Sequence, residues 1–260
     1  MSVENLRVLA GDTWGQKLSM HIEQSSLPAF SWAKRNLEIL KETSGTLVGL
    51  VDLDGKKCYL KYYPIESWQR RLWFKAGLSR GSKSYAKARV LLNNDILVPR
   101  PYTCVLARHG LLLLTEAIHQ AVDLQTLWDR GQASSDHECW ELAGGSLAKL
   151  HTMGFFHGDF KWSNLLLAES EIYLVDLEAV GELSRNSKKR YRDIARFTLN
   201  AEDMAAPVEV YRRSMQAYFA ATGLQEREVT KHTLPILNRL RARHLKKYGP
   251  RGHLLMGMTP

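Results

Sequence analysis

The stretch His157-Gly-Asp-Phe-Lys-Trp-Ser-Asn164, followed by Val175-Asp-Leu177, constrains this chain more than any other feature. Asp159 precedes Asn164 by five positions, and Asp176 follows Asn164 after twelve more. Transfer of a phosphoryl group depends on positioning and on counter-charge more than on covalent chemistry. Enzymes of this kind place one aspartate as a base, and an asparagine and a second aspartate as metal ligands, at this spacing. The pattern therefore predicts a phosphoryl-transfer site.

Each residue of the pattern has an expected role. Asp159 would accept the proton of the attacking hydroxyl group, and Asn164 would bind Mg²⁺ through its amide oxygen. Asp176 would bind the Mg²⁺ that bridges the β- and γ-phosphates of ATP, because magnesium takes few protein ligands and fills its remaining positions with water and phosphate. His157 is expected to orient the backbone. The alternative is a buried aspartate that caps a turn beside an ordinary hairpin.

The residues around the pattern predict the local structure. Two short apolar segments, 165–167 and 172–175, predict strands joined by a turn at 168–171. Such a hairpin would bring Asn164 and Asp176 to the same end, side by side. The segment from Cys139 to His151 predicts an amphipathic helix that stops at Gly154.

A phosphoryl-transfer enzyme of this kind also needs a lysine for the α- and β-phosphates. Segments 46–52 and 57–62 predict two strands joined by a turn at Asp54-Gly55. Lys61, near the end of the second strand, is the candidate, although Lys56 and Lys57 lie nearby and most lysines are simply solvated. Gly45 precedes the first strand, and its loop could offer backbone amides to phosphate, or could be an ordinary turn.

The connection between two lobes is expected after an apolar strand at 111–116. Residues 104–108 would pair with this strand across the turn at His109-Gly110. Glu116 would then begin a hinge, 116–118, whose backbone meets the adenine of ATP. A buried core strand is the alternative interpretation of the leucines, and it is compatible with the first.

The whole pattern predicts an α+β, two-lobed, protein-kinase-like fold. Residues 1–117 would form a strand-rich, nucleotide-binding N-lobe with a small antiparallel β-sheet. Residues 118–260 would form a mainly α-helical C-lobe with the catalytic loop and a basic C-terminal tail. Besides 139–151, helices are expected at 123–128, 189–200, 208–222 and 226–247.

These residues resemble the bacterial lipopolysaccharide core kinases, which include heptose kinases and Kdo (3-deoxy-octulosonate) kinases. The resemblance rests on the loop 157–166, on Tyr173-Leu-Val-Asp-Leu-Glu178 and Arg192-Asp-Ile-Ala-Arg-Phe197, and on segments 57–61 and 95–101. It covers roughly residues 40–200, and it implies phosphorylation of an inner-core sugar by ATP at the cytoplasmic face of the inner membrane. Lys161 matches the lysine that many protein kinases use to neutralise the γ-phosphate; the alternative is a solvated loop lysine.

The chain departs from the kinase pattern at one point. Kinases usually hold the strand lysine with a glutamate from a helix between that strand and the hinge. No acidic residue occurs between Ser67 and Asn94, and Glu66 is too close to Lys61 in sequence. Either another group orients Lys61, or a different lysine binds the phosphates, or the enzyme is weakly active or inactive. The presence of Asp159, Asn164 and Asp176 argues against a weakly active or inactive enzyme.

The chain carries a formal net charge of +9 that is concentrated in three clusters. They lie within 67–94, 185–196 and 230–260, and each could be a set of solvated helix faces. Together they favour a polyanionic partner: a phosphorylated glycolipid, an anionic membrane surface or nucleic acid. Segment 68–74, with its aromatic residues, is the candidate for peripheral membrane contact, unless Trp73 and Phe74 belong to the core.

Other bulk properties limit the choices further. The chain has 260 residues, 45% of them hydrophobic, which is enough for a real core. No apolar run reaches the roughly 20 residues that span a bilayer, and the N-terminal residues do not read as a signal peptide. Cys58, Cys104 and Cys139 show no metal-site spacing and are expected to be reduced thiols of a cytoplasmic protein.

The leading hypothesis is a lipopolysaccharide sugar kinase, with heptose placed before Kdo as the acceptor. A small-molecule phosphotransferase is the second, because the His-Gly-Asp loop also resembles aminoglycoside and choline kinases, and a protein Ser/Thr kinase is the third. The short segment after Asp176 favours a non-protein substrate. A basic nucleic-acid-binding protein on a kinase-derived scaffold is the non-enzyme alternative, but no nucleic-acid motif is present and no such partner is expected.

Overall fold

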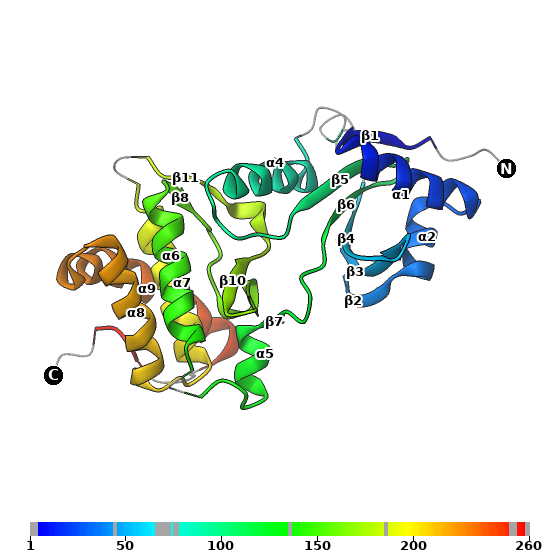
Figure 1. The fold of residues 1–260 in the computed structure, drawn as a ribbon. Helices are drawn as coiled ribbons and strands as arrows, with labels where there is room; N and C mark the ends of the chain where they lie inside the picture. Colours follow the sequence, from blue (N-terminus) through cyan, green and yellow to red (C-terminus); the bar gives the residue numbers. More distant parts are fainter. Residues whose placement is uncertain are drawn as a thin grey trace. The chain divides into compact units, whose positions relative to one another are not determined.

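The computed structural model describes residues 5–43, 46–65, 74, 78–134, 137–184, 187–249 and 254–257. The chain divides into two compact units. Unit 1 comprises Met1–Asn93 and Val98–Ile118, and unit 2 comprises Asn94–Leu97 and His119–Pro260. Figure 1 shows the elements of each unit along the chain.

Unit 1 is built on a six-stranded antiparallel sheet in the order β1-β5-β6-β4-β3-β2. Its central strands alternate between two buried faces, so their sequences are almost continuously apolar, as in Gly110–Glu116. The turn at Asp54-Gly55 joins β3 to β4, as expected. The strands are β1 (Arg7–Ala10), β2 (Glu38–Thr43), β3 (Thr46–Leu53), β4 (Lys56–Pro64), β5 (Pro101–Leu106) and β6 (Gly110–Glu116).

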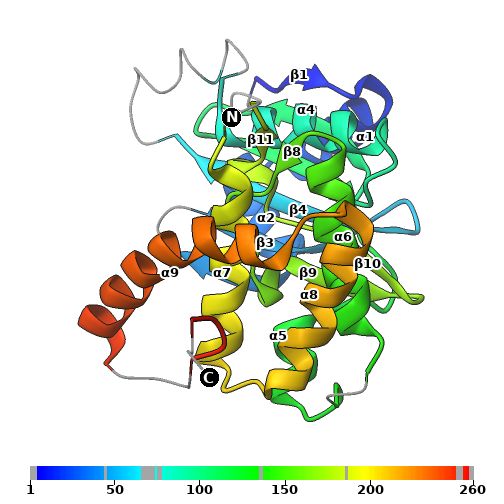
Figure 2. The same ribbon diagram turned by 90° about the vertical axis from the view of Figure 1, so that its left-hand side faces the viewer.

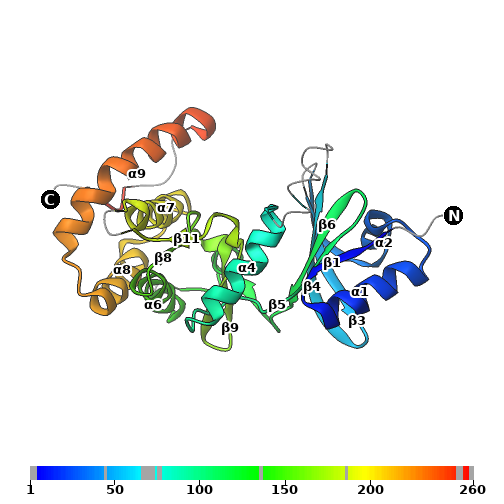
Figure 3. The ribbon, with the colours of Figure 1, turned by 90° about the horizontal axis from the view of Figure 1, so that it is seen from above.

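Helices cover both faces of this sheet (Figure 3). On one face, α1 (Asp12–Gln24) and α2 (Ala29–Asn36) contribute Leu18, Ile22 and Trp32 to the larger core cluster. On the other face, Tyr85 of α4 (Arg80–Leu92) packs with Tyr63 and other side chains of β4, β5 and β6. Phe74 packs against the same cluster, which favours a core role for the one described residue of segment 68–74.

Unit 2 is mainly helical, with α6 packed against α8 and α7 packed against α9 (Figure 2). Local signals explain several boundaries. The Asp123 carboxylate caps α5 by accepting from the Thr126 N–H at 3.0 Å, and Pro207 precedes the first residue of α8. The helices are α5 (Leu124–Asp129), α6 (Cys139–Thr152), α7 (Lys189–Asp203), α8 (Val208–Thr222) and α9 (Glu226–Tyr248).

Two small sheets hold the loops of unit 2. The hairpin of β9 (Leu165–Ala168) and β10 (Glu171–Leu174) pairs further with β7 (Val122–Asp123). The second sheet joins β8 (Phe155–Phe156) to β11 (Gly181–Glu182). The predicted hairpin and the five predicted helices are confirmed within a few residues, as is the α+β, protein-kinase-like class of the fold.

The chain shows three further features that bear on the predictions. Cys58, Cys104 and Cys139 are free and buried, and burial raises the pKa of their thiols to about 11, about 12 and about 12 respectively. No helix within the described residues is long and apolar enough to cross a membrane. The sequence did not predict the helices α1, α2 and α4 or the strands β1, β2, β7, β8 and β11.

The packing of α6 against α8 gives a testable prediction. A Cβ atom on Gly144 would lie 1.9 Å from the backbone oxygen of Ser214, whereas a Cβ on Gly145 would meet nothing within 4 Å. We expect Gly144→Ala to lower the free energy of unfolding by about 1–3 kcal/mol, because the two helices must separate. The neighbouring control Gly145→Ala should raise it by about 0.5–1 kcal/mol, since alanine favours helix. Urea denaturation of both variants checks this, and equal effects would show that the helices do not touch at Gly144.

Candidate functional site

The loop that begins at His157 leaves β8 and passes through a short 3₁₀ turn, Trp162–Asn164, into β9. Gly158 has φ +84°, and a Cβ there would lie 2.9 Å from the Ala179 backbone oxygen. Only glycine adopts this conformation without strain, and only glycine fits the close approach. Gly158 therefore permits the tight backbone that leads directly into Asp159.

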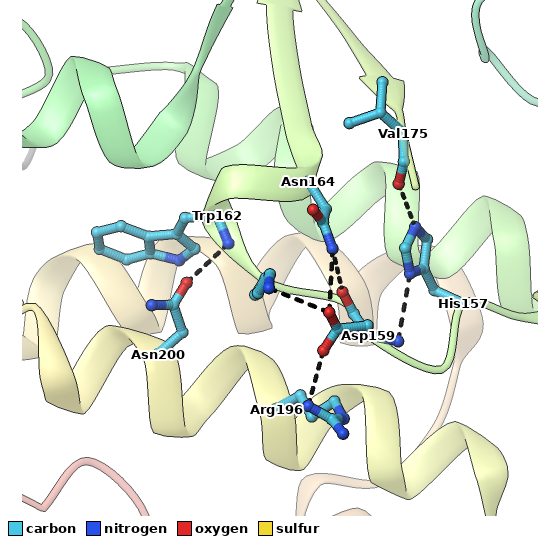
Figure 4. Close-up of polar contacts among 8 residues, drawn as sticks. His157, Asp159, Trp162, Asn164, Val175, Arg196 and Asn200 are labelled. Atoms are coloured by element: carbon cyan, nitrogen blue, oxygen red, sulfur yellow. Dashed lines mark hydrogen bonds and ion pairs between the residues drawn. The ribbon is translucent and has the colours of Figure 1, made fainter. Parts of the chain in front are cut away.

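The Asp159 carboxylate is held on both sides (Figure 4). Arg196 of α7 donates from Nη1 to Asp159 Oδ1 at 2.7 Å, and Lys161 Nζ lies 3.1 Å from Asp159 Oδ2. The Asp159 side chain is 26% exposed, so solvent or a substrate can reach it. The structure thus brings together Asp159 and Lys161, and it adds Arg196 as a second cation.

Asn164 is tied to the same aspartate. Its Nδ2 donates to the backbone oxygen of Asp159 at 2.9 Å and lies 3.4 Å from Oδ2 (Figure 4). The amide nitrogen therefore faces Asp159, and the amide oxygen points to the other side. This orientation is required of a residue that offers its oxygen to a metal ion.

Asp176 comes next to Asn164, as the hairpin predicted. The strands pair with Leu165 opposite Leu174, and the Val175 N–H donates to the Asn164 backbone oxygen at 3.1 Å. Asp176 follows with a left-handed backbone, φ 59° and ψ 56°, and its side chain is exposed. One carboxylate and one amide oxygen form a hard-donor set that fits Mg²⁺, with phosphate and water as its other ligands.

Asp193 of α7 binds the backbone at the start of the loop. Its side chain is completely buried and accepts hydrogen bonds from the His157 N–H at 2.6 Å and the Gly158 N–H at 2.7 Å. Because Asp193 and Arg196 lie three residues apart on one helix, α7 fixes both the backbone before Asp159 and the Asp159 carboxylate itself. The position of the candidate base therefore depends on α7.

Two buried histidines complete this anchor. His151 contacts Tyr218 Oη through Nδ1 at 3.0 Å and Asp193 Oδ2 through Nε2 at 3.4 Å. His157 accepts from the Asp159 N–H at 3.3 Å through Nδ1, so its Nε2 donates to the Val175 oxygen at 3.0 Å. His157 thus connects the loop to the strand that carries Asp176, in agreement with its expected structural role. Burial lowers the pKa of both imidazoles, against the opposing effect of Asp193.

These lowered pKa values predict a pH dependence of stability. Below pH 6.5, the ordinary pKa of histidine, the unfolded chain takes up protons that the folded chain rejects. The free energy of unfolding should therefore fall as the pH drops below about 6.5, by up to about 1.4 kcal/mol per pH unit for each histidine. Denaturation curves between pH 7.5 and 5.5 check this.

The matched variants separate these histidines from other groups that titrate with them. His151→Gln should make the curve flatter than that of the wild type, because one of the two buried imidazoles is gone. His119→Gln should leave the slope unchanged, since this side chain is exposed. An unchanged slope in His151→Gln would show that His151 takes up its proton equally in both states.

The base of the loop rests on aromatic packing. The backbone N–H of Trp162 donates to Asn200 Oδ1 of α7 at 2.7 Å (Figure 4), and the buried Trp162 ring packs with the rings of Trp128, Trp140 and Phe197. Two of these rings come from α5 and α6, which places the 3₁₀ turn against the helical core. The loop is thus fixed at three points, through Asp193, Arg196 and Asn200.

The N-terminal candidates lie in unit 1. Lys61 is on β4 opposite Leu113 of β6, and its Nζ lies 5.0 Å from the centroid of the Tyr63 ring. Glu116 ends β6, where its N–H donates to the Arg100 oxygen at 2.8 Å, and the boundary between the units follows at Ile118. Gly45 lies outside the described residues.

The helix that could hold Lys61 carries no acidic residue. α4 follows β4 in the chain and packs against β5 and β6, but its sequence, RGSKSYAKARVLL, contains neither Asp nor Glu. Its Tyr85 belongs to the same cluster as Tyr63, the residue that Lys61 contacts. The sequence indicated that no acidic residue between Ser67 and Asn94 is available to hold Lys61, and this also applies to α4, the helix in that position.

The contacts of Asp193, Arg196 and Asn200 with the loop were not predicted from the sequence. All three lie on α7, and two belong to the segment Arg192–Phe197 that carried the family resemblance. The signal in the sequence was that Asp193 is the one acidic residue in the basic segment 185–196, and burial of such a carboxylate requires strong hydrogen-bond donors. The identity of those donors depends on contacts 35 and 36 residues apart, which the spacing of residues does not reveal.

Comparison with a solved structure supports the class of fold. The structure described as "WaaP in complex with acyl carrier protein" aligns with a TM-score of 0.58, covering 93% of this chain and 99% of that chain, at 15% sequence identity. At this identity the likeness establishes the fold and nothing finer. It places the chain in the protein-kinase-like class that the spacing of Asp159, Asn164 and Asp176 predicted.

Sequence comparisons identify the family. Residues 30–218 match the model of the lipopolysaccharide kinase (Kdo/WaaP) family, and the chain belongs to this family. A 3-deoxy-D-manno-octulosonic acid kinase of Xanthomonas oryzae pv. oryzae is 28% identical over 169 residues, covering 60% of this chain and 66% of the relative. A kinase of the same description from Vibrio vulnificus is 30% identical over 112 residues, covering 41% and 47%. The chain thus spans slightly less than two thirds of the Xanthomonas oryzae relative. The family resemblance seen in the sequence is confirmed.

Proposed function

We propose that this protein is an ATP-dependent kinase that phosphorylates a sugar of the lipopolysaccharide inner core. The observation that carries the proposal is the loop of unit 2. There, Asn164 is hydrogen-bonded to Asp159, and the strand that leads to Asp176 pairs beside it, in a chain of the lipopolysaccharide kinase family. These contacts support the roles of a base for Asp159 and of metal ligands for Asn164 and Asp176. We further propose Kdo as the acceptor, although the sequence alone favoured heptose. Support comes from the relatives named above, which are described as kinases of this sugar.

In this proposal the acceptor hydroxyl oxygen attacks the γ-phosphorus of ATP, and the bond to the β–γ bridging oxygen breaks to release ADP. Asp159 takes the proton of the hydroxyl group. Asn164 and Asp176 would hold Mg²⁺, which supplies counter-charge to the phosphates. Lys61 would contact the α- and β-phosphates, the loop at Gly45 would offer backbone amides, and the segment from Glu116 to Ile118 would meet the adenine.

Arg196 and Lys161 have different roles in this scheme. Arg196 reaches Asp159 Oδ1 from a helix that also anchors the loop, so we assign it to orienting the base. The Lys161 side chain is 41% exposed, and it pairs with Asp159 Oδ2 from a position two residues later in the same loop. We assign Lys161 to the γ-phosphate, an exchange of partners that would leave Oδ2 to accept the proton.

We also propose that the protein acts at the cytoplasmic face of the inner membrane, where it touches anionic lipid peripherally. The last turns of α9 support this, because basic residues alternate there with exposed apolar ones: Arg243, Leu245, Lys246, Lys247 and Tyr248. Co-sedimentation with vesicles that contain anionic lipid, but not with neutral vesicles, is the expected result. Equal sedimentation with both would remove this part of the proposal.

The proposed function is tested with the purified full chain, Mg²⁺, ATP and lipopolysaccharide core from which the phosphate of the acceptor sugar is absent. We expect ADP to form only when both acceptor and Mg²⁺ are present. A second core substrate, in which the heptose hydroxyl groups are free and those of Kdo are blocked, distinguishes heptose from Kdo as the acceptor. If ADP forms with an aminoglycoside or a protein and not with either core, the enzyme class stands and the proposed acceptor is wrong.

A further inference from the structure

A cavity of about 290 Å³ lies in unit 2 where the loop that enters α7 meets α9. Its lining side chains include Ser184, Ser187, Lys188, Arg190, Tyr191 and His232, and no acidic residue is among those described. Neither the kinase pattern nor the family resemblance assigned a role to this place. We propose that the cavity binds an oxyanion of the acceptor, a phosphate or carboxylate group other than the one formed in the reaction; this inference rests on the proposed function.

The donors of the cavity are suited to an anion. Arg190 Nε is buried and has no hydrogen-bond partner among the described residues, which is costly for a charged donor unless a ligand supplies one. Lys188 is exposed and immediately precedes α7, so its charge adds to the positive end of that helix. The two serines add hydroxyl groups that donate to the same kind of ligand.

The wall formed by α9 is held in place by a ring stack. The Tyr191 and His232 rings lie 4.9 Å apart at 29°, which fixes the imidazole against the entrance of α7. Glu228, one turn earlier on α9, has its Oε2 3.9 Å from His232 Nε2, outside the set of residues that line the cavity. The cavity therefore has one wall from α9, which the ring stack joins to α7, and one cationic wall from the start of α7.

The cavity is connected to the catalytic loop through short-range contacts. Leu183 donates its N–H to the Gly154 oxygen at 2.7 Å, and β11 just before it pairs with β8, the strand that leads into His157. Arg190 and Arg196 are six residues apart on α7, which is about 9 Å along the helix axis and about 120° around it. In this proposal the second anionic group of the acceptor lies one or two sugars away from the hydroxyl group that meets Asp159, and the acceptor passes around the start of α7 to reach the cavity.

The volume limits the size of the bound group. Pockets for drug-sized molecules run from roughly 300 to 1,000 Å³, so a cavity of about 290 Å³ admits a phosphate or a carboxylate with part of its sugar. A whole nucleotide does not suit this size. The cavity would thus select acceptors by an anion that they already carry, before transfer takes place.

The first experiment measures steady-state kinetics of the full chain with two acceptors. One acceptor is core lipopolysaccharide that keeps its other phosphate groups, and the second is the same material after chemical removal of those phosphates. The variants are Lys188→Gln and His232→Gln. The matched control is Lys231→Gln, which removes a charge from the exposed side of α9 beside His232 and does not line the cavity. Arg190 is left unchanged because it lies near the buried His151 and Tyr218.

With the phosphate-bearing acceptor, we expect each cavity variant to raise the acceptor KM about tenfold, since one charge-assisted hydrogen bond is lost. The kcat should stay within about twofold, and the KM for ATP should not change. With the stripped acceptor, the wild type and the variants should have the same raised KM. If the variants are impaired equally with both acceptors, the ligand is the carboxylate, which the treatment leaves in place. If neither variant changes either KM, the inference is wrong.

The second experiment does not depend on catalysis. Inorganic phosphate should raise the thermal midpoint of the wild type and of Lys231→Gln above that in chloride at equal ionic strength, because a ligand bound only to the folded state stabilises it. Lys188→Gln and His232→Gln should lose most of this increase. Loss of the increase together with absent kinase activity would retain the cavity and refute the proposed function. An undiminished increase in both variants would refute the cavity, whatever the activity.

Discussion

Asp159→Asn should lower kcat for phosphoryl transfer by about 10²–10⁴, because a positioned general base contributes rate of this order. The substitution keeps the shape of the side chain and its contacts with Arg196 and Asn164 partly intact, so folding should survive. Affinity for Mg-ATP should stay within about tenfold, since the proposed metal ligands are Asn164 and Asp176. Kinetics of ADP release and equilibrium binding of a fluorescent ATP analogue measure the two effects.

A matched control separates loss of the base from loss of any nearby charge. Glu169 is exposed in the turn of the hairpin that joins Asn164 to Asp176, so Glu169→Gln removes a carboxylate from the same substructure. This variant should have the kcat of the wild type. Near-normal transfer by Asp159→Asn would remove Asp159 as the base, and equal losses in both variants would indicate a general electrostatic effect.

Asp193→Asn should have an effect of similar size for a different reason. The wild-type carboxylate accepts from two backbone N–H groups and faces His151, and an amide must turn its own N–H groups toward one of these donors. One buried donor then lacks an acceptor, so we expect the free energy of unfolding to fall by about 2–4 kcal/mol. We also expect kcat to fall about 100-fold, because a displacement of the base near 1 Å costs that much.

The readouts distinguish positioning from stability alone. Measured well below the unfolding midpoint of the variant, kcat should fall while the KM for ATP stays near that of the wild type. Asp203→Asn, on the same helix, alters a contact of 3.0 Å between the Asp203 Oδ2 and His244 Nε2 atoms and should change both stability and kcat only slightly. An Asp193→Asn variant that is destabilised but retains the wild-type kcat would show that the anchor supports folding and does not position Asp159.

The part of the molecule that carries the candidate site was predictable because its signals are local. The apolar segments on either side of the turn at 168–171 define the hairpin, and its pairing brings Asn164 next to Val175 and Asp176 without any long-range information. The periodic helices of unit 2 were found for the same reason. Residues 7–43 were not predicted, because their apolar residues are scattered. Leu18 and Ile22 of α1 are spaced one helical turn apart, a signal that the charged surroundings obscured.

The parts of the site that the sequence did not reveal are those joined by long-range contacts. In the sequence, nothing distinguishes Asp193, Arg196 and Asn200 from other polar residues of a basic helix. Only the fold shows that α7 packs against the loop. Likewise, the basic cluster of 185–196 was assigned only to a general polyanion. Its Lys188 and Arg190 line a defined cavity together with His232 of α9, a contact that the sequence does not reveal.

The proposed function is tested most directly by mass spectrometry of the product that the purified chain forms from ATP, Mg²⁺ and inner-core lipopolysaccharide with an unphosphorylated Kdo. We expect one added phosphate on the Kdo residue, absent when Mg²⁺ is removed and lost in Asp159→Asn. A core that remains unmodified while the protein binds Mg-ATP, or a phosphate found on another acceptor, would contradict it.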